Sequence, residues 1–275
     1  MMRNGLSVIM IGRNEELFLP RTLPPLRRVA NEIVFVDTGS DDRTCEIAAS
    51  FQCRLFHLPW QHDFSQPKNF AIEQAQYRWI LSVDCDEELD VSSQGVAALR
   101  RCCRSTKDPL FLVAIDNLQA DGGVTRHEAM RLFRNDPRIR FNNPVHESIC
   151  DAIYQHWPQH HSQPAQVRLI HHGYSSGDNR TKLERNMDIL RRWVDREPDN
   201  LYACYKLGMN LYFRQQMEQS LPLLQRAFQL LDQATDRHSY PFLNPLVSHY
   251  LDLLQQQGDT EQLAQAKARI ALWGP

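Results

Sequence analysis

The chain has 275 residues and a formal net charge of −2, with 42% hydrophobic and 23% charged residues. This length suffices for one large domain or two ordinary ones, and the composition is typical of a soluble globular protein. A net charge so close to zero argues against a broad electrostatic surface for nucleic acid or anionic membrane. We therefore expect no nucleic-acid partner.

The seven cysteines include no Cys-x-x-Cys pair. An odd number without metal-type spacing predicts reduced thiols rather than a disulfide framework or a zinc site, as in a cytoplasmic protein. The N-terminal segment MMRNGLSVIMIG lacks the apolar length and the cleavage site of a signal peptide. No stretch approaches the roughly 18 apolar residues that span a bilayer. We expect a soluble, cytoplasmic protein without a transmembrane segment.

The first 90 residues alternate between strand and helix patterns. Short apolar runs predict buried strands at 6–11, 32–36, 54–58 and 79–83. Helix patterns occupy 44–51 and 66–76, and an earlier helix carries Leu17, Leu19 and Leu23 until Pro24-Pro25 cut it. This alternating order predicts an α/β fold, with a mostly parallel sheet and helices on both faces.

The strand at 79–83 runs directly into an acidic segment formed by Asp84, Asp86, Glu87 and Glu88. Four carboxylates within five residues repel one another unless a cation lies among them. Because ligands in open α/β sheets bind where the strands end, this Asp-x-Asp is well placed to hold a hard divalent ion and, through it, a diphosphate. The alternative is a solvated acidic turn before a helix.

Glycine-based nucleotide signatures are absent from the sequence. There is no Gly-x-Gly-x-x-Gly after the first strand, which disfavours a dinucleotide cofactor, and no Walker lysine loop. The glycine-rich N-terminal loop expected of a sugar-nucleotide pyrophosphorylase is also missing. Binding of a diphosphate through a metal therefore fits the carboxylates better, and nucleotidyl transfer is the weaker enzymatic alternative.

Four segments resemble the family-2 glycosyltransferases when they are taken together and in order: VIMIGRNEE, EIVFVDTGSDDRT, FSQPKNFAIEQA and WILSVDCDEEL. Further motifs, RLFRN, Val-His-Glu and His-His-Gly-Tyr, resemble the bacterial branch with lipopolysaccharide-core and peptide or protein glycosyltransferases. The resemblance covers roughly residues 5–185. It implies the nucleotide-diphosphosugar transferase (GT-A) fold with a mixed, mostly parallel sheet. Lys68 stands where this branch more often has an arginine. Lysine keeps the positive charge but lacks the planar guanidinium group.

The resemblance assigns four residues to a nucleotide-sugar donor. Asp37 would accept a hydrogen bond from the base, as in uridine-nucleotide relatives, and Asp84 would bind the ribose. Lys68 would lie near the nucleotide or diphosphate, and Arg13 belongs to the same donor-binding set. As alternatives, Asp37 would cap the helix after Ser40, and Lys68 would be an exposed helix lysine.

The same resemblance assigns a divalent cation, Mg²⁺ or Mn²⁺, to Asp86. His171 follows an apolar strand at 167–170 and is a plausible neutral imidazole for the metal or diphosphate, with His172 as its alternative. Glu87 would support the site or face the donor sugar. The chain has eleven histidines, so a histidine by itself is weak evidence for a ligand.

Residues 110–149 are expected to build the acceptor side, with strands at 111–115 and 131–134 and a hairpin turn at 121–123. Transfer with inversion needs a base opposite the leaving diphosphate, and His146 and Glu147 are the candidates. On a strand these neighbours would point to opposite faces, so they would not both face the donor unless the segment bends. As alternatives, Glu147 is an ion-paired residue and His146 a structural one.

From about residue 180 the strand patterns end and helix formers dominate, at 183–196, 201–214, 217–232, 245–256 and 260–272. Small residues such as Gly208 and Ser220 fall near the spacing of a tetratricopeptide repeat (TPR). We therefore expect a catalytic domain at 1–178 and an all-α, TPR-like domain at 179–275. A repeat domain with so few helix pairs is rarely stable by itself, so we expect these helices to dock on the catalytic domain. The alternative is a groove that binds a peptide acceptor or a protein partner.

These observations predict a metal-dependent inverting glycosyltransferase that uses a nucleotide-diphosphate sugar, specifically a UDP-sugar, as donor. The acceptor stays open between a saccharide, a lipid-linked saccharide and a peptide or protein. The alternative from another class is a non-catalytic helical scaffold whose transferase-like domain binds nucleotide without transferring a sugar.

Overall fold

The computed structural model describes residues 2–119, 121–172 and 179–274. The chain divides into two compact units, Met1–Asn179 and Arg180–Pro275. Gly173 and Tyr174 of the His-His-Gly-Tyr motif lie outside the described residues. Within the described ranges, every helix is too short or too polar to cross a membrane.

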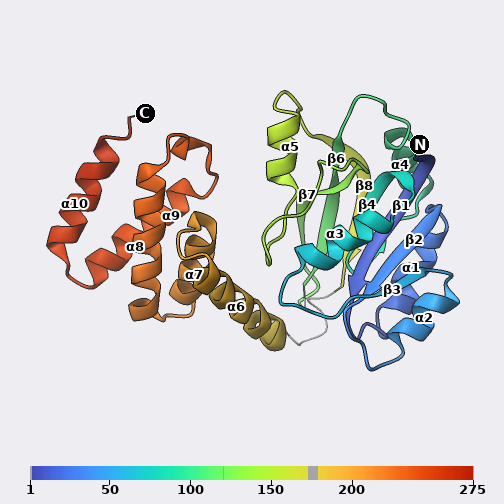
Figure 1. The fold of residues 1–275 in the computed structure, drawn as a ribbon, viewed down its shortest axis with the longest axis horizontal. Coiled ribbons are helices and arrows are strands. Elements are labelled where there is room, and N and C mark those ends of the chain that lie inside the picture. The colour runs from blue at the N-terminus through green and yellow to red at the C-terminus, as the bar shows by residue number, and fades with distance from the viewer. Residues whose placement is uncertain (1, 120, 173–178, 275) are drawn as a thin grey trace. The chain divides into compact units, whose positions relative to one another are not determined.

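The first unit is an α/β domain built on one eight-stranded sheet (Figure 1). Its strands are β1 (Arg3–Gly12), β2 (Glu32–Asp37), β3 (Arg54–His57), β4 (Tyr77–Ser82), β5 (Glu87–Leu89), β6 (Leu110–Leu118), β7 (Val124–Arg134) and β8 (Gln163–His171). Its helices are α1 (Leu19–Arg27), α2 (Thr44–Ser50), α3 (Ser65–Gln74), α4 (Ser93–Cys102) and α5 (Cys150–His156).

The strand order across the sheet is β3-β2-β1-β4-β7-β6-β8-β5. The first four strands of the chain pair in parallel with one another, and β8 pairs in parallel with β6. Strand β7 runs antiparallel to both β4 and β6, and β5 runs antiparallel to β8. The sheet is therefore mixed and mostly parallel, which confirms the GT-A-type architecture expected from the sequence.

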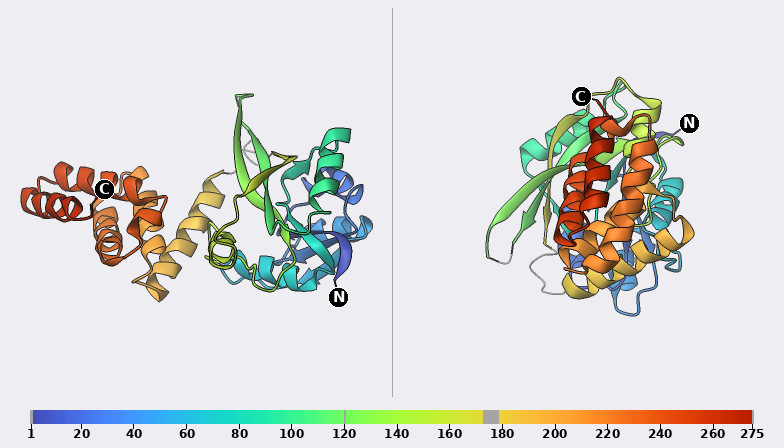
Figure 2. Two further views of the ribbon diagram at one scale, coloured as in Figure 1. Left: turned by 90° about the horizontal axis from the view of Figure 1, so that it is seen from above. Right: turned by 90° about the vertical axis from the view of Figure 1, so that its left-hand side faces the viewer.

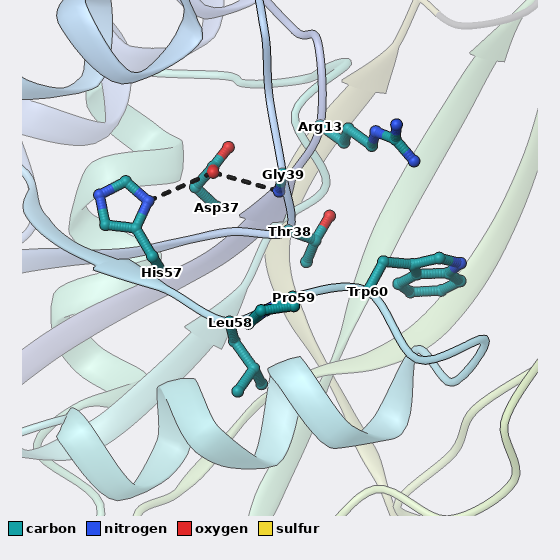
Figure 3. Close-up of a pocket in the computed structure, with 8 residues that line it drawn as sticks. All are labelled: Arg13, Asp37, Thr38, Gly39, His57, Leu58, Pro59 and Trp60. Atoms are coloured by element: carbon teal, nitrogen blue, oxygen red, sulfur yellow. Dashed lines mark hydrogen bonds and ion pairs between the residues drawn. The ribbon is translucent and has the colours of Figure 1, made fainter.

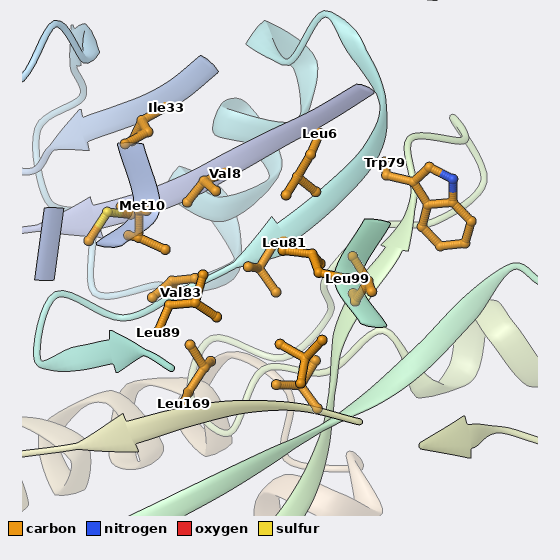
Figure 4. Close-up of a cluster of buried hydrophobic side chains, with 14 of the residues drawn as sticks. Leu6, Val8, Met10, Ile33, Trp79, Leu81, Val83, Leu89, Leu99 and Leu169 are labelled. Atoms are coloured by element: carbon orange, nitrogen blue, oxygen red, sulfur yellow. The ribbon is translucent and has the colours of Figure 1, made fainter. Parts of the chain in front are cut away.

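The sheet is buried on both faces, because successive side chains of its central strands point into two different hydrophobic clusters. Leu6, Val8 and Met10 of β1 belong to one cluster, which Figure 4 shows together with Leu81 of β4. Ile9 belongs to the other. Side chains of α1, α2 and α4 complete the first cluster, and side chains of α3 and α5 complete the second. This explains why β1, β2 and β4 read as continuous apolar runs.

Helix α1 begins and ends later than the sequence pattern predicts. Leu17 precedes the helix and is 84% exposed, while Pro24 and Pro25 lie inside it. Each proline removes a backbone donor, which ordinarily breaks a helix. Here Leu23 and Leu26 are fully buried, so tertiary packing keeps this segment helical through Arg27.

The acidic segment after β4 is not the solvated turn that was the alternative. Asp86 and Glu87 are buried, and the short strand β5 pairs with β8, with Glu87 opposite His171. The sequence pattern does not predict β5, because its buried glutamate does not match a strand pattern. The helices α4 and α5 were not predicted either.

The second unit consists of α6 (Asn179–Arg196), α7 (Leu201–Phe213), α8 (Met217–Gln233), a 3₁₀ turn η1 (Arg237–Ser239), α9 (Leu243–Gln256) and α10 (Thr260–Ala271). From α7 to α10, each α-helix packs on the next (Figure 2). A side chain at Gly208 would place Cβ 2.6 Å from Cδ2 of Leu224, and Ser220 Oγ donates a hydrogen bond to Gly208 O at 2.8 Å. These small residues let α7 and α8 approach closely, as the TPR-like spacing predicts. Docking on the first unit stays a prediction.

Candidate active site

The site lies where β1, β2 and β4 end. Gly12, the last residue of β1, pairs with Asp37, the last residue of β2. Val83 N–H donates to Ile9 O at 3.1 Å, which keeps the chain beyond β4 at the same edge. Gly12 is needed here because a Cβ would lie 2.8 Å from Sγ of Cys85. The residues that follow the three strands are thereby brought together.

An open pocket of about 390 Å³ lies beside the end of β2 (Figure 3). It is lined by Arg13, Asp37, Thr38, Gly39, His57, Leu58, Pro59 and Trp60. Figure 3 shows Asp37 between His57 and Gly39, with the exposed Arg13 on the other side of Thr38. Two of the expected donor-binding residues, Asp37 and Arg13, therefore share one pocket.

Asp37 is buried, and its carboxylate is held by the loop that follows it. The N–H groups of Gly39 and Ser40 donate to it at 3.1 Å each, and His57 Nδ1 lies 3.3 Å from Oδ2. Burial raises the pKa of Asp37, but these hydrogen bonds outweigh burial and lower the pKa below its usual value. The alternative role of helix cap is wrong, because α2 has no side-chain cap.

Asp84, immediately beyond β4, is neutralised by two cations from other elements. Lys68 Nζ of α3 lies 3.2 Å from Oδ1, and Arg131 Nη2 of β7 lies 2.7 Å from Oδ2. Burial raises the pKa of Asp84, but the charges of Arg131 and Lys68 lower it far more. Asp84 is therefore ionised at neutral pH, and its side chain is still 38% exposed.

Lys68 is 4% exposed, so the alternative of an exposed helix lysine is wrong. Its Nζ bridges Asp84 and Glu147, the latter at 2.6 Å, and lies 5.3 Å from the centre of the Phe141 ring. Burial lowers the pKa of Lys68, but the two carboxylates raise it above its usual value. Lys68 thus joins the end of β4 to the turn that carries Glu147.

Glu87, which is buried, and Arg131, which is partly buried, form an ion pair next to Asp84. Glu87 is 2% exposed, accepts the N–H of Asp84 at 2.8 Å and lies 3.0 Å from Arg131 Nη2. Burial raises the pKa of Glu87 to about 7; Arg131 opposes this rise and the charge of Asp84 adds to it. Arg131 is part of the RLFRN motif, but the sequence alone assigned no role to this residue. Only the pairing of β7 with β4 brings it to the site.

Asp86 and His171 meet across the paired strands β5 and β8. His171 Nε2 lies 3.2 Å from Asp86 Oδ2, and its Nδ1 lies 3.0 Å from Asn117 Oδ1. Because Asn117 Nδ2 donates to the carbonyl of Thr125, its Oδ1 accepts, and His171 Nδ1 carries a proton. Burial lowers the pKa of His171, but Asp86 raises it overall.

This pair fits a divalent cation. A neutral His171 protonated on Nδ1 presents a bare Nε2 toward the Asp86 carboxylate, and metal-binding histidines commonly donate their other N–H in this way. Asp84 fits a cation less well, since both of its oxygens already accept bonds from Lys68 and Arg131.

His172 Nε2 lies 3.0 Å from Glu88, which also binds Arg21 at 2.6 Å. This favours His171 over His172 as the ligand beside Asp86. The protein's own cationic and imidazole groups therefore lie among the carboxylates of the acidic segment. A metal ion is not required to relieve their repulsion, contrary to the inference from the sequence.

The segment that carries His146 and Glu147 bends and is not a strand, which is the exception left open in the interpretation of the sequence. His146 is exposed and adopts a positive φ of 56°, and the chain bends at this point. Glu147 is 17% exposed and binds Lys68. A positive φ is uncommon outside glycine, and the residue types gave no sign of it.

Residues 7–140 match the sequence profile of Glycosyl transferase family 2. The matched segment includes Asp37, Lys68, Asp84, Asp86 and Arg131. The chain contains a family-2 glycosyltransferase domain. The resemblance read from the sequence motifs is thereby confirmed.

Curated relatives carry similar segments. A protein from Synechococcus elongatus described as TPR repeat-containing is 36% identical over 74% of this chain and 51% of its own length. The Bacillus subtilis glycosyltransferase SunS is 24% identical over 90% of this chain and 58% of its own length. The chain thus spans about half the length of these relatives.

The fold also matches a solved structure. Staphylococcus aureus TarS 1–349, crystallised in complex with UDP, has a TM-score of 0.51 and 15% identity, with 92% of each chain covered. At this identity, the likeness shows the fold of the family-2 domain and its helical continuation.

Proposed function

We propose that this protein is a metal-dependent, inverting glycosyltransferase that moves a sugar from a nucleotide-diphosphate donor, a UDP-sugar, to a saccharide, lipid-linked or peptide acceptor. We assign catalysis to residues 1–178 and treat 179–275 as a TPR-like helical domain. The observation that carries the proposal is the convergence of Asp37, Asp84 and Asp86 at the carboxyl ends of β2 and β4, within a family-2 domain.

The donor would lie across this edge of the sheet. Asp37 lines the same pocket as Arg13, and its carboxylate would take a donor from the base there. The exposed part of Asp84 can accept from the ribose. Lys68 and Arg131, which pair with Asp84, would supply hydrogen-bond donors to a diphosphate on the same side.

Asp86 and His171 would hold Mg²⁺ or Mn²⁺, leaving further positions for diphosphate oxygens and water. When bound, the cation stabilises the charge that develops on the departing diphosphate. The hydrogen bond from His171 to Asn117 fixes the ring for this contact. Glu87 would position the Arg131 guanidinium through their ion pair.

Glu147 would act as the base, with His146 as the second candidate. The carboxylate would take the proton of the acceptor hydroxyl as that oxygen bonds the anomeric carbon and the bond to the diphosphate breaks. Its contact with Lys68, which also binds Asp84, favours Glu147, because this contact joins it to the donor side of the site. Attack from the face opposite the diphosphate inverts the anomeric centre.

The helical domain would present the acceptor or a protein partner. We also propose a cytoplasmic location, since all seven cysteines are free thiols and a reducing compartment keeps them so. Neither proposal affects the chemistry of the donor site.

The proposed function is tested by a thermal-shift screen of nucleotide sugars with and without Mn²⁺, followed by donor hydrolysis or transfer. We expect UDP-sugars to stabilise the protein, and more so with Mn²⁺. Binding without any turnover would instead support the nucleotide-binding scaffold. No stabilisation by any nucleotide would contradict both.

The base is tested by Glu147→Gln. Turnover should fall about 10²- to 10⁴-fold, the usual contribution of general-base catalysis, with UDP affinity unchanged. Glu128→Gln, an exposed glutamate on β7, is the matched control and should keep full activity. A near-normal rate in Glu147→Gln would remove Glu147 from the chemistry and leave His146.

A further inference from the structure

A second cluster of metal-ligand side chains lies on the other side of the pocket from Arg13. Asp37, Cys45 and His57 each offer one ligand atom, and these three atoms all lie within 4.8 Å of one another. Among the residues described by the structure, no other group of three or more histidine, cysteine or acidic side chains meets this criterion.

The fold brings these residues together from three elements. Asp37 and His57 end the parallel strands β2 and β3, where they are register partners. Cys45 lies in the first turn of α2, directly after the loop that Asp37 holds through Gly39 and Ser40. The positions of the backbone are therefore set by the sheet and the loop.

The three side chains differ in freedom. The Asp37 carboxylate is 5% exposed and fixed by backbone N–H groups, whereas the His57 side chain is 66% exposed with Nδ1 3.3 Å from Oδ2. Cys45 is partly buried. A rigid carboxylate, a partly accessible thiol and an exposed ring can close on a cation with little movement of the backbone.

We propose that Asp37, Cys45 and His57 form a binding site for a thiophilic divalent cation, for which Zn²⁺ is the biological candidate. A thiolate, an imidazole and a carboxylate are the ligands that Zn²⁺ takes, and the thiolate in this set does not suit Mg²⁺. Three protein ligands would leave one position of a tetrahedral set for water or another ligand. On binding, the thiol of Cys45 loses its proton to solvent as the bond from sulfur to metal forms.

This site has a consequence for the donor, which rests on the proposed function. The Asp37 carboxylate that would ligate the cation is the one that would accept from the nucleotide base. Occupation by Zn²⁺ and binding of UDP therefore exclude each other. Zinc would inhibit the enzyme by competition with the nucleotide, at a place separate from the Asp86–His171 pair.

The first test uses Co²⁺ as a spectroscopic substitute for Zn²⁺, added to the full chain without nucleotide. We expect the absorption of tetrahedral Co²⁺ with a thiolate charge-transfer band, displaced by Zn²⁺. Cys45→Ser should abolish this band, and Cys150→Ser, a partly buried cysteine of α5, should keep it. His57→Ala should weaken Co²⁺ binding at least about tenfold, and His156→Ala should not.

A charge-transfer band that survives Cys45→Ser, or Co²⁺ affinity unchanged in His57→Ala, would overturn the site. The second test adds UDP to the Co²⁺ complex of the wild-type chain. We expect the cobalt band to fall as UDP is added. If Co²⁺ binds through Cys45 and UDP leaves the band unchanged, the metal site stands, and it is the placement of the base at Asp37 that fails.

Discussion

Replacement of Arg131 tests most directly the ion pairs that hold Asp84 and Glu87 in the site. Its guanidinium lies 2.7 Å from Asp84 and 3.0 Å from Glu87, with the side chain 16% exposed. Arg131→Met keeps much of the volume and removes the charge. Two carboxylates on the segment after β4 then lose a shared cation.

Removing one partner of a buried ion pair typically costs about 3–5 kcal/mol. Two features reduce this loss. Lys68 still lies 3.2 Å from Asp84, whose side chain is 38% exposed and screened by water. Glu87 has a pKa of about 7 and can take up a proton at neutral pH. We therefore expect a loss of about 2–3 kcal/mol in the free energy of opening of β4 and β7.

Amide hydrogen exchange of the full chain measures this loss strand by strand. We expect exchange in β4 and β7 to accelerate roughly 30- to 150-fold, the factor that corresponds to about 2–3 kcal/mol. Arg126→Met is the matched control on the same strand: Arg126 binds Asp116 but is 58% exposed, so its loss should accelerate exchange far less than the loss of Arg131. Equal exchange rates in the two variants would refute the reasoning.

Two further predictions concern the helical unit. Gly208→Ala gains about 1 kcal/mol of helix propensity, but it forces Cβ against Leu224, and such overpacking costs about 1–3 kcal/mol. The melting temperature of this variant should therefore fall. A rise would show that α8 moves to make room for the added methyl group. Asp232 accepts from Trp273 Nε1 at 2.7 Å and Arg269 Nε at 2.9 Å; burial raises its pKa, but these bonds lower it overall. Because the pKa of Asp232 is lowered in the folded state, its carboxylate stabilises the fold above about pH 4, and this stability is lost as the pH falls further. Asp232→Asn should therefore have a lower melting temperature than the wild type at pH 7, and the two melting temperatures should converge in acid.

Most of the strands could be predicted because burial on both faces leaves a continuous apolar run in the sequence. The strands near 32–36 and 79–83 read clearly for this reason, and β2 is buried throughout. The failures have causes that lie outside the local sequence. Helix α1 contains two prolines that only tertiary packing tolerates, and β5 carries a buried Glu87 whose partner, Arg131, is distant in sequence.

The site could be predicted in its residue types but not in its pairings. The carboxylates were evident because they follow strands, and Asp86 with His171 was expected from the resemblance. The role of Asn117 depends on the pairing of β6 with β8, and that of Arg131 depends on the pairing of β7 with β4. Such non-local contacts leave no periodicity in the sequence. Likewise, the triad of Asp37, Cys45 and His57 follows from strand register rather than from cysteine spacing.

The central claim is that the acidic edge of the sheet binds a nucleoside diphosphate together with a cation on Asp86. Calorimetric titration of UDP into the full chain, with and without Mn²⁺, tests this most directly. We expect Mn²⁺ to raise UDP affinity roughly tenfold or more in the wild type and in Asp195→Asn, an exposed control on α6, but not in Asp86→Asn. UDP affinity that is independent of Mn²⁺, or a Mn²⁺ effect that persists in Asp86→Asn, would contradict the account.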